Sequence, residues 1–313
     1  MVNIEHLDRI RLVSSPLVQR ILATILLKPN YNLFARVEIE VENMEKIPTD
    51  ETVIFAMNHT DRYNYWPFQY KLWTMKCFPY TTVWVKAKYY RNAILGKALD
   101  WCNLIPVPSM GYLIEEFYKK RFRKRIDSIE YRTIKDFIDG KLGAESLTKL
   151  GSEVSILLRE NFFDFIKNYY ESVMARVAQL SRSALLEKGL DLIIFPEGTR
   201  SLKLAEGKTG IAQLALHTEK KIVPVGCSNC EEVYCWTLPF ARSGKITYRV
   251  GDPLSVHDEL RKYRIKEEFS LFSRESQKKY KEKFENVTRI IMERINRIVD
   301  EKYKSGEELR AEG

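Results

Sequence analysis

The chain has 313 residues, of which 45% are hydrophobic and 30% charged, a composition typical of a globular protein long enough to bury a core. Its net charge of +9 and pI near 9.1 indicate an anionic partner. Because no nucleic-acid-binding motif is recognisable, we expect no nucleic-acid partner and favour an anionic membrane surface or an acidic carrier protein. The five cysteines are odd in number and lack framework spacing, which argues against a disulfide scaffold and for a reducing compartment.

Short apolar runs bounded by polar turn residues alternate with segments of helical periodicity along the chain. Strands are predicted at 37–41, 53–57, 81–85, 104–107, 190–195, 222–227 and 245–250. Helices are predicted at 66–75, 91–100, 112–188, 209–218 and within the last fifty residues. This alternation predicts an α/β fold with a mostly parallel central sheet flanked by helices, N-terminal interfacial helices and a long helical insertion.

Three parts follow from this pattern. We predict an N-terminal membrane-contacting helical segment at 1–35, an α/β domain at 36–255 and a C-terminal helical extension at 256–313. The helical residues 110–185 form an insertion in the α/β domain, although a separately folding helical domain stays open as an alternative.

Two segments favour attachment to a membrane surface. Pro16 to Leu27 is mostly apolar, too short to cross a bilayer and long enough to lie in its interface. Packing of this helix on the core is the alternative. Lys119 to Arg125 carries six positive charges in seven residues, which suits docking to anionic headgroups or a solvated helix face. We expect no signal peptide, because residues 1–15 are charged throughout, and no spanning helix.

Two polar strings follow predicted strands and carry the chemistry. Asn58 to Asn64 follows the run 53–57, and Phe195 to Ser201 follows the run that ends at Phe195. Ligands of α/β sheets bind at the carboxyl ends of strands. A histidine supplies a base near neutral pH, and a Gly-containing turn with a hydroxyl and an arginine supplies donors to an anion. A base beside an anion pocket is what acyl transfer to a phosphate-bearing alcohol would require.

The chain resembles the glycerolipid acyltransferases, the lysophosphatidic acid acyltransferase family. The family's Phe-Pro-Glu-Gly-Thr-Arg-Ser block is matched residue for residue by Phe195 to Ser201, and its Asn-His block by Asn58-His59. An apolar strand carrying proline matches Ile222-Val223-Pro224-Val225. A further block matches loosely, at Val85-Lys86-Ala87-Lys88, Leu95 to Leu99 and Ile105-Pro106-Val107. The resemblance covers roughly 50–110 and 185–255.

This resemblance implies a membrane-associated O-acyltransferase of phospholipid biosynthesis, at the cytoplasmic face of a membrane. The donor would be acyl-CoA or acyl carrier protein as co-substrate, without a cofactor, and the acceptor a lysophospholipid or glycerol phosphate. His59 would be the general base. The implied substrate-binding residues are Lys86, Glu197, Gly198, Thr199, Arg200 and Pro224, with Arg200 and its neighbours on the acceptor phosphate and Glu197 organising the site.

The sequence departs from the family pattern at several points. Asn64 stands where the family has an aspartate, and Pro108-Ser109 where the loose block normally ends in arginine. The stretch from Met110 to Leu185 is also far longer than the usual connection. A carboxylate partner would orient a histidine and stabilise its charged form, whereas an amide does only the first.

Three interpretations of position 64 stay open. Asn64 orients His59 with reduced power, or Asp61 takes over as the carboxylate, or the chain binds acyl or lipid ligands without turnover. We favour activity, because the block from Glu197 to Arg200 is complete. Because Ser109 stands where the family has an arginine, an acceptor that lacks phosphate, such as an amine or a sugar alcohol, is a further alternative.

Cysteines near the fourth block raise the question of zinc. Cys227, Cys230 and Cys235 lie close in sequence, but a second pair at finger-like spacing is missing. We therefore expect no metal and interpret these cysteines as small core side chains.

Overall fold

The computed structural model of the protein describes residues 2–147 and 150–306. The predicted segments 1–35, 110–185 and 256–313 each include a few other positions, which lie outside the described residues. The chain divides into two compact units. The first comprises Met1–Ile10, Val85–Ala98 and Pro106–Val177, and the second Arg11–Trp84, Leu99–Ile105 and Ala178–Gly313. The domain boundaries proposed from the sequence stay predictions.

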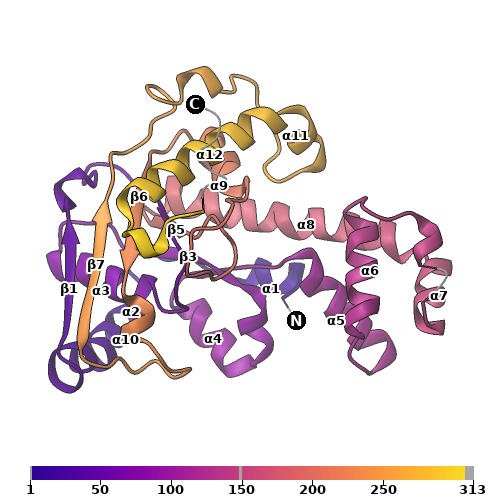
Figure 1. Ribbon diagram of the computed structural model, residues 1–313, viewed down its shortest axis with the longest axis horizontal. Helices are drawn as coiled ribbons and strands as arrows, with labels where there is room; N and C mark the ends of the chain where they lie inside the picture. The colour runs from indigo at the N-terminus through magenta and orange to yellow at the C-terminus, as the bar shows by residue number, and fades with distance from the viewer. Residues whose placement is uncertain (1, 148–149, 307–313) are drawn as a thin grey trace. The chain divides into compact units, whose positions relative to one another are not determined.

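A seven-stranded sheet forms the framework, with the order β1-β7-β6-β2-β5-β3-β4 (Figure 1). Its strands are β1 (Val37–Glu42), β2 (Ile54–Met57), β3 (Thr81–Lys86), β4 (Leu104–Val107), β5 (Asp191–Ile194), β6 (Ile222–Ser228) and β7 (Gly244–Val250). Every residue of β2, β5 and β6 is buried, which is expected for central strands covered on both faces.

Strand direction decides which segments share an edge of the sheet. β2 pairs in parallel with both β5 and β6, and β3 pairs in parallel with β5. β6 and β7 pair antiparallel, and β7 pairs in parallel with β1. The carboxyl ends of β2, β5 and β6 therefore lie together at one edge, where β7 begins. The predicted α/β class with a mostly parallel sheet is confirmed.

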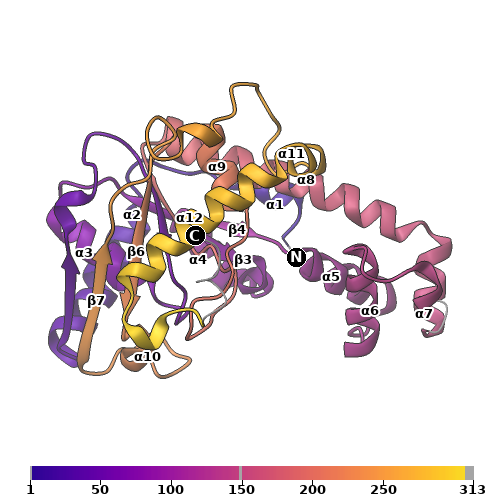
Figure 2. The same ribbon diagram turned by 45° about the horizontal axis from the view of Figure 1, so that its top comes forward.

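The helices of the second unit cover the sheet. They are α2 (Leu17–Leu22), α3 (Tyr65–Met75), α9 (Gly210–Thr218), α10 (Cys230–Val233), α11 (Arg274–Lys279) and α12 (Lys281–Ile298). α12 packs on β6 and β2, and Figure 2 shows it in front of the sheet with α3 behind. On the α3 side, the Phe68 ring contacts those of Phe55 and Tyr248. The apolar spacing predicted for the C-terminal helix is thus used against the sheet.

The first unit is helical. Entirely within it lie α1 (Ile4–Arg9), α5 (Met110–Phe122), α6 (Ser128–Ile138) and α7 (Ser152–Arg159). Two further helices have residues in both units, α4 (Ala93–Trp101) and α8 (Phe162–Arg182). Over the described part of 112–188, the predicted helical character is confirmed. Within the basic run that closes α5, Arg121 pairs with Glu160, and Lys124 pairs with Glu153.

The predicted interfacial helix consists of α2 and a π-helical turn, Ala23–Leu27. Ala23 and Leu27 are buried. Leu17, Ile21 and Ile25 are 62%, 43% and 71% exposed and follow one another at four-residue intervals, which places them on one helix face. The segment therefore packs through one side and leaves an apolar stripe in solvent. Among the described residues, no helix is both long and apolar enough to cross a bilayer.

Candidate active site

The register of β2 and β5 brings the two polar strings together. Ala56 pairs with Ile194, so His59 and Glu197, each three residues further on, leave the sheet at the same edge. The His59 imidazole stacks on the Phe195 ring, with centroids 4.2 Å apart and planes at 23°. The Ser201 N–H also donates to the His59 carbonyl oxygen at 2.9 Å. The predicted base and the predicted anion-binding turn are thus direct neighbours.

Glu197 joins these two segments through its buried carboxylate. Its Oε1 accepts the His59 N–H at 2.8 Å, and its Oε2 accepts the Ala205 N–H at 2.9 Å. Burial raises the pKa of the Glu197 carboxyl, while the two N–H donors oppose that rise. Glu197 therefore holds the backbone of the histidine, and its predicted part in substrate binding stays a prediction.

Asn58, which precedes the histidine, fastens β2 to β6. Its amide donates to the Cys227 carbonyl oxygen at 3.0 Å, and its side-chain oxygen accepts the Cys227 N–H at 2.6 Å. This two-way contact joins residues 169 positions apart. Asn58 was not among the site residues predicted from the sequence, although it forms the first position of the Asn-His block.

Asn64 and Asp61 shape the turn that carries the histidine. The Asn64 side-chain oxygen accepts the Asp61 N–H at 2.5 Å, and its amide donates to Thr60 Oγ1 at 3.1 Å. Asp61 Oδ1 in turn accepts the Tyr63 N–H at 2.8 Å. Both side chains are buried and are used inside their own loop. Whether either one also serves the His59 ring stays a prediction.

Buried tyrosines pack against this turn. The Tyr248 hydroxyl donates to the Asn64 backbone carbonyl at 2.6 Å. The hydroxyls of Tyr31 and Tyr234 lie 2.6 Å apart, and burial raises the pKa of both. Burial likewise raises the pKa of Asp61, although backbone N–H groups and the charges of Arg200 and Arg62 oppose it. The turn is therefore fixed by many satisfied polar contacts.

The turn after β5 is built differently. Gly198 has φ +66°, a left-handed conformation that favours glycine. A Cβ at this position would lie 3.3 Å from Cδ and Cε of Lys208 and 3.5 Å from its Nζ. Because the Lys208 N–H also donates to the Pro196 carbonyl at 2.9 Å, this lysine is folded onto the turn. Thr199 and Arg200 are exposed beside it. Sequence reasoning missed Lys208.

The other predicted site residues lie elsewhere. Pro224 is buried inside β6, opposite Ala56, and its carbonyl accepts the Gly251 N–H at 2.8 Å. Lys86 is the last residue of β3, partly exposed, and belongs to the first unit. Cys227 and Cys230 are buried and Cys235 is exposed. Across the described ranges, no group of three or more side chains suited to a metal is found.

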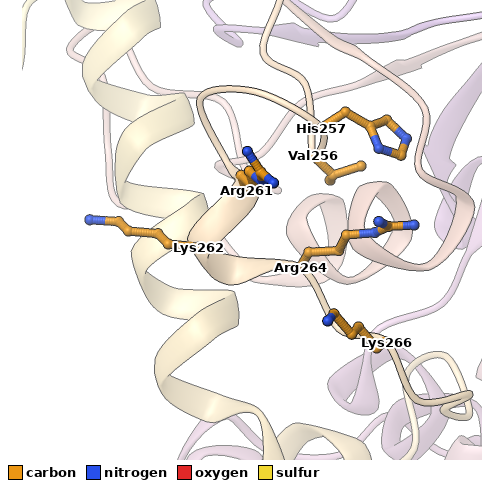
Figure 3. Close-up of a pocket in the computed structure, with 6 residues that line it drawn as sticks. All are labelled: Val256, His257, Arg261, Lys262, Arg264 and Lys266. Carbon is orange, nitrogen blue, oxygen red and sulfur yellow. The ribbon is translucent and has the colours of Figure 1, made fainter.

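A cavity of about 640 Å³ lies apart from these residues (Figure 3). It is lined by Val256, His257, Arg261, Lys262, Arg264 and Lys266. Glu219 pairs with both Arg264, at 2.7 Å, and His257, at 3.3 Å. These residues follow β7, which runs opposite to β6, and Leu254 bridges to Ile222 at the start of β6. The cavity is therefore at the sheet edge opposite His59.

The model of a family described as "Acyltransferase" matches residues 143–228. This range includes the string from Phe195 to Ser201. Over this stretch the chain thus matches an acyltransferase-family domain. The resemblance predicted from the sequence is confirmed, and with it the assignment of the protein as an acyltransferase. A solved structure, the 1-acyl-sn-glycerophosphate acyltransferase PlsC from Thermotoga maritima, is similar at 15% identity and a TM-score of 0.41, covering 87% of this chain and 80% of that one. No curated protein matches the chain.

Proposed function

We propose that this acyltransferase is membrane-associated and moves a fatty acyl group from acyl-CoA or acyl carrier protein to a hydroxyl of a lysophospholipid or glycerol phosphate. The observation that carries the proposal is the 2.8 Å hydrogen bond between Glu197 and the His59 backbone. It joins a histidine and a cation-bearing turn at one sheet edge, and this reaction needs both a base and an anion site.

His59 is the general base in this mechanism. It takes the proton of the acceptor hydroxyl while the hydroxyl oxygen attacks the thioester carbonyl. The tetrahedral intermediate then collapses, the carbon–sulfur bond breaks, and the leaving thiolate takes the proton back from the imidazolium. The products are an ester and a thiol. No metal is needed, because the thioester is already activated and the base supplies on the order of 10²–10⁴-fold.

The acceptor phosphate binds at the turn after β5. Arg200 presents a guanidinium fork, which suits two phosphate oxygens, and the Lys208 ammonium adds a second positive charge. The exposure of Thr199 and Arg200 supports this role, since a ligand can reach them. Lys86 is proposed as an additional cation from the resemblance alone.

Membrane association rests on the N-terminal segment. The apolar stripe of Leu17, Ile21 and Ile25 faces solvent, and such a stripe suits the boundary between headgroups and acyl chains. The net charge of +9 favours an anionic lipid surface. We place the protein at the cytoplasmic face of the membrane, as a peripheral or monotopic enzyme.

Product formation from radiolabelled acyl-CoA and lysophosphatidic acid tests the reaction. His59→Ala should lower turnover about 10²–10⁴-fold, because it removes the base. His257→Ala is the matched control, since His257 lies at the opposite sheet edge, and it should leave turnover unchanged. If His59→Ala keeps more than about a tenth of the turnover, the assignment of the base fails.

The same assay separates the alternatives. Acyl-CoA binding without product, from every acceptor offered, would favour a lipid-binding protein that has lost turnover. Product only from phosphate-free monoacylglycerol would favour a different acceptor class. Parallel reactions with glycerol phosphate, lysophosphatidic acid and monoacylglycerol therefore decide among the three.

A further inference from the structure

Three large apolar side chains stand in solvent on the segment after α10. Trp236, Leu238 and Phe240 are 58%, 59% and 50% exposed and occupy alternate positions of the chain. The segment belongs to the second unit and runs from α10 back to β7, along the edge where β6 ends (Figure 1). We name these three side chains the apolar wedge.

The backbone between the wedge residues is fastened to the protein. The Thr237 carbonyl accepts hydrogen bonds from the Tyr63 hydroxyl at 2.9 Å and from Arg62 at 3.2 Å. The Asn30 side chain donates to the Pro239 carbonyl at 3.2 Å and accepts the Ala241 N–H at 3.1 Å. Four hydrogen bonds at residues 237, 239 and 241 thus hold the segment, while the wedge side chains are exposed.

The first anchor of the wedge is the catalytic turn itself. Arg62 and Tyr63 lie within the string that starts at Asn58 and carries His59. The Tyr63 ring also contacts that of Tyr234, with centroids 4.9 Å apart, at the beginning of the wedge segment. Any surface that takes up the wedge is therefore brought next to the histidine.

The second anchor belongs to a segment with exposed apolar side chains of its own. Asn30 begins a π-helical turn, Asn30–Phe34, whose Leu33 and Phe34 are 68% and 77% exposed. Two segments distant in sequence are thus tied together at Asn30, and both present apolar side chains. Clustered exposed apolar groups of this kind mark an interaction site.

The chemistry of this surface fits a lipid bilayer. Tryptophan prefers the membrane–water interface, where its ring is buried and its N–H stays hydrated. Two arginines lie close to the wedge. Arg62 donates to the Thr237 carbonyl between two wedge residues, and Arg242 follows Phe240 by two positions in the sequence. Both suit anionic headgroups. A protein partner would match the apolar side chains but would leave this combination of tryptophan and flanking arginines unexplained.

We infer that Trp236, Leu238 and Phe240 insert into the membrane surface and seat the catalytic turn on it, so that an acceptor reaches His59 without leaving the bilayer. The insertion stands on the wedge alone, whereas the delivery of the acceptor rests on the proposed function. The wedge is distinct from the helix stripe of Leu17, Ile21 and Ile25, and the two surfaces can be tested separately.

The test compares vesicle binding by the full-length protein and a triple variant, Trp236→Ser, Leu238→Ser and Phe240→Ser. Sedimentation uses vesicles of phosphatidylcholine with phosphatidylglycerol. The partition coefficient of the triple variant should fall roughly ten-fold or more, because three apolar side chains no longer leave water. The matched control replaces Ile129, Leu142 and Ile156, three exposed apolar residues of the first unit, with serine. It should bind like the parent protein.

Two further readouts complete the test. Brominated lipids should quench the fluorescence of the parent protein more than that of Trp236→Phe. The triple variant should lose turnover of vesicle-embedded lysophosphatidic acid about ten-fold and keep turnover of water-soluble glycerol phosphate. Absence of turnover in the parent protein as well as in the variants would reject the proposed function but leave the vesicle result standing.

Equal vesicle binding by the triple variant and the parent protein, with equal quenching in Trp236→Phe, would overturn the inference. So would a concentration-dependent dimer of the parent protein that the triple variant loses while vesicle binding is unchanged. That outcome would assign the wedge to a second copy of the chain.

Discussion

The two strings that make the candidate site are held in opposite ways. In the turn after β2, the side chains of Asn58, Asp61 and Asn64 are all buried and form hydrogen bonds with other groups of the protein. Among the polar residues of the turn after β5, only Glu197 is buried, while Thr199 and Arg200 face solvent. The proposed base is therefore held in place by the protein itself, whereas the proposed anion site stays accessible to a ligand.

This difference suits the chemistry that we propose for each half. A base must be oriented within a fraction of an ångström, and buried polar networks give that precision when every member is satisfied. A phosphate site must keep its cations accessible, since burying unpaired charges is costly. Glu197 is buried and hydrogen-bonded like the polar residues of the turn after β2, yet it lies on the turn after β5. It is therefore the link between the two turns.

Among changes that leave His59 in place, breaking that link should have the largest effect. Glu197→Gln keeps the shape of the side chain but replaces one acceptor oxygen with an NH₂ group. Either the His59 N–H or the Ala205 N–H then faces a donor, at a cost of about 1–3 kcal/mol in the free energy of unfolding. We expect turnover to fall about ten- to a hundred-fold, because a misplacement near 1 Å is that damaging.

Denaturant unfolding and initial rates, measured on the same preparation, check this prediction. Glu206→Gln is the control, because Glu206 is an exposed carboxylate on the same loop. If Glu197→Gln unfolds at the same denaturant concentration as the parent and keeps full turnover, Glu197 does not join the two turns.

Changes on the open turn should act on acceptor binding instead. Arg200→Lys keeps the charge but loses the planar fork, and the Michaelis constant for the acceptor should rise about ten-fold. Lys208→Met should raise it less, since it removes one point charge from an exposed site. The Michaelis constant for the acyl donor and the free energy of unfolding should stay the same in both variants. Steady-state kinetics with each substrate varied in turn measures this, and a rise for the donor alone would contradict it.

The sequence predicted the frame of both turns but not the contacts inside them. β4 has the predicted bounds, and β5 differs by one residue at each end, because a continuous apolar run between turn residues marks a buried strand. The contact between Asn58 and Cys227 and the fold of Lys208 over Gly198 were not foreseen. Each depends on how a loop closes in three dimensions, which periodicity does not encode.

The smallest effect is expected where the buried turn departs from the family pattern. Asn64→Asp should preserve the turn, because a carboxylate oxygen can still accept the Asp61 N–H and Thr60 can reverse its hydroxyl to donate. The new charge would stabilise the imidazolium of His59 during proton transfer, and we expect turnover to rise about two- to ten-fold. The same charge should move the acidic limb of the pH–rate profile to higher pH, since protonated His59 becomes harder to deprotonate.

Asp61 provides the opposing outcome for this prediction. Its buried carboxyl already has a raised pKa, so a second carboxylate nearby would repel it and favour a shared proton. If Asp61 is the working partner of His59, Asp61→Asn should abolish turnover and Asn64→Asp should lower it. Pre-steady-state turnover and pH–rate profiles of both variants decide between the two. A rise in Asn64→Asp together with a shifted acidic limb would identify position 64 as the partner of the base, because a merely structural change in the turn would not move that limb.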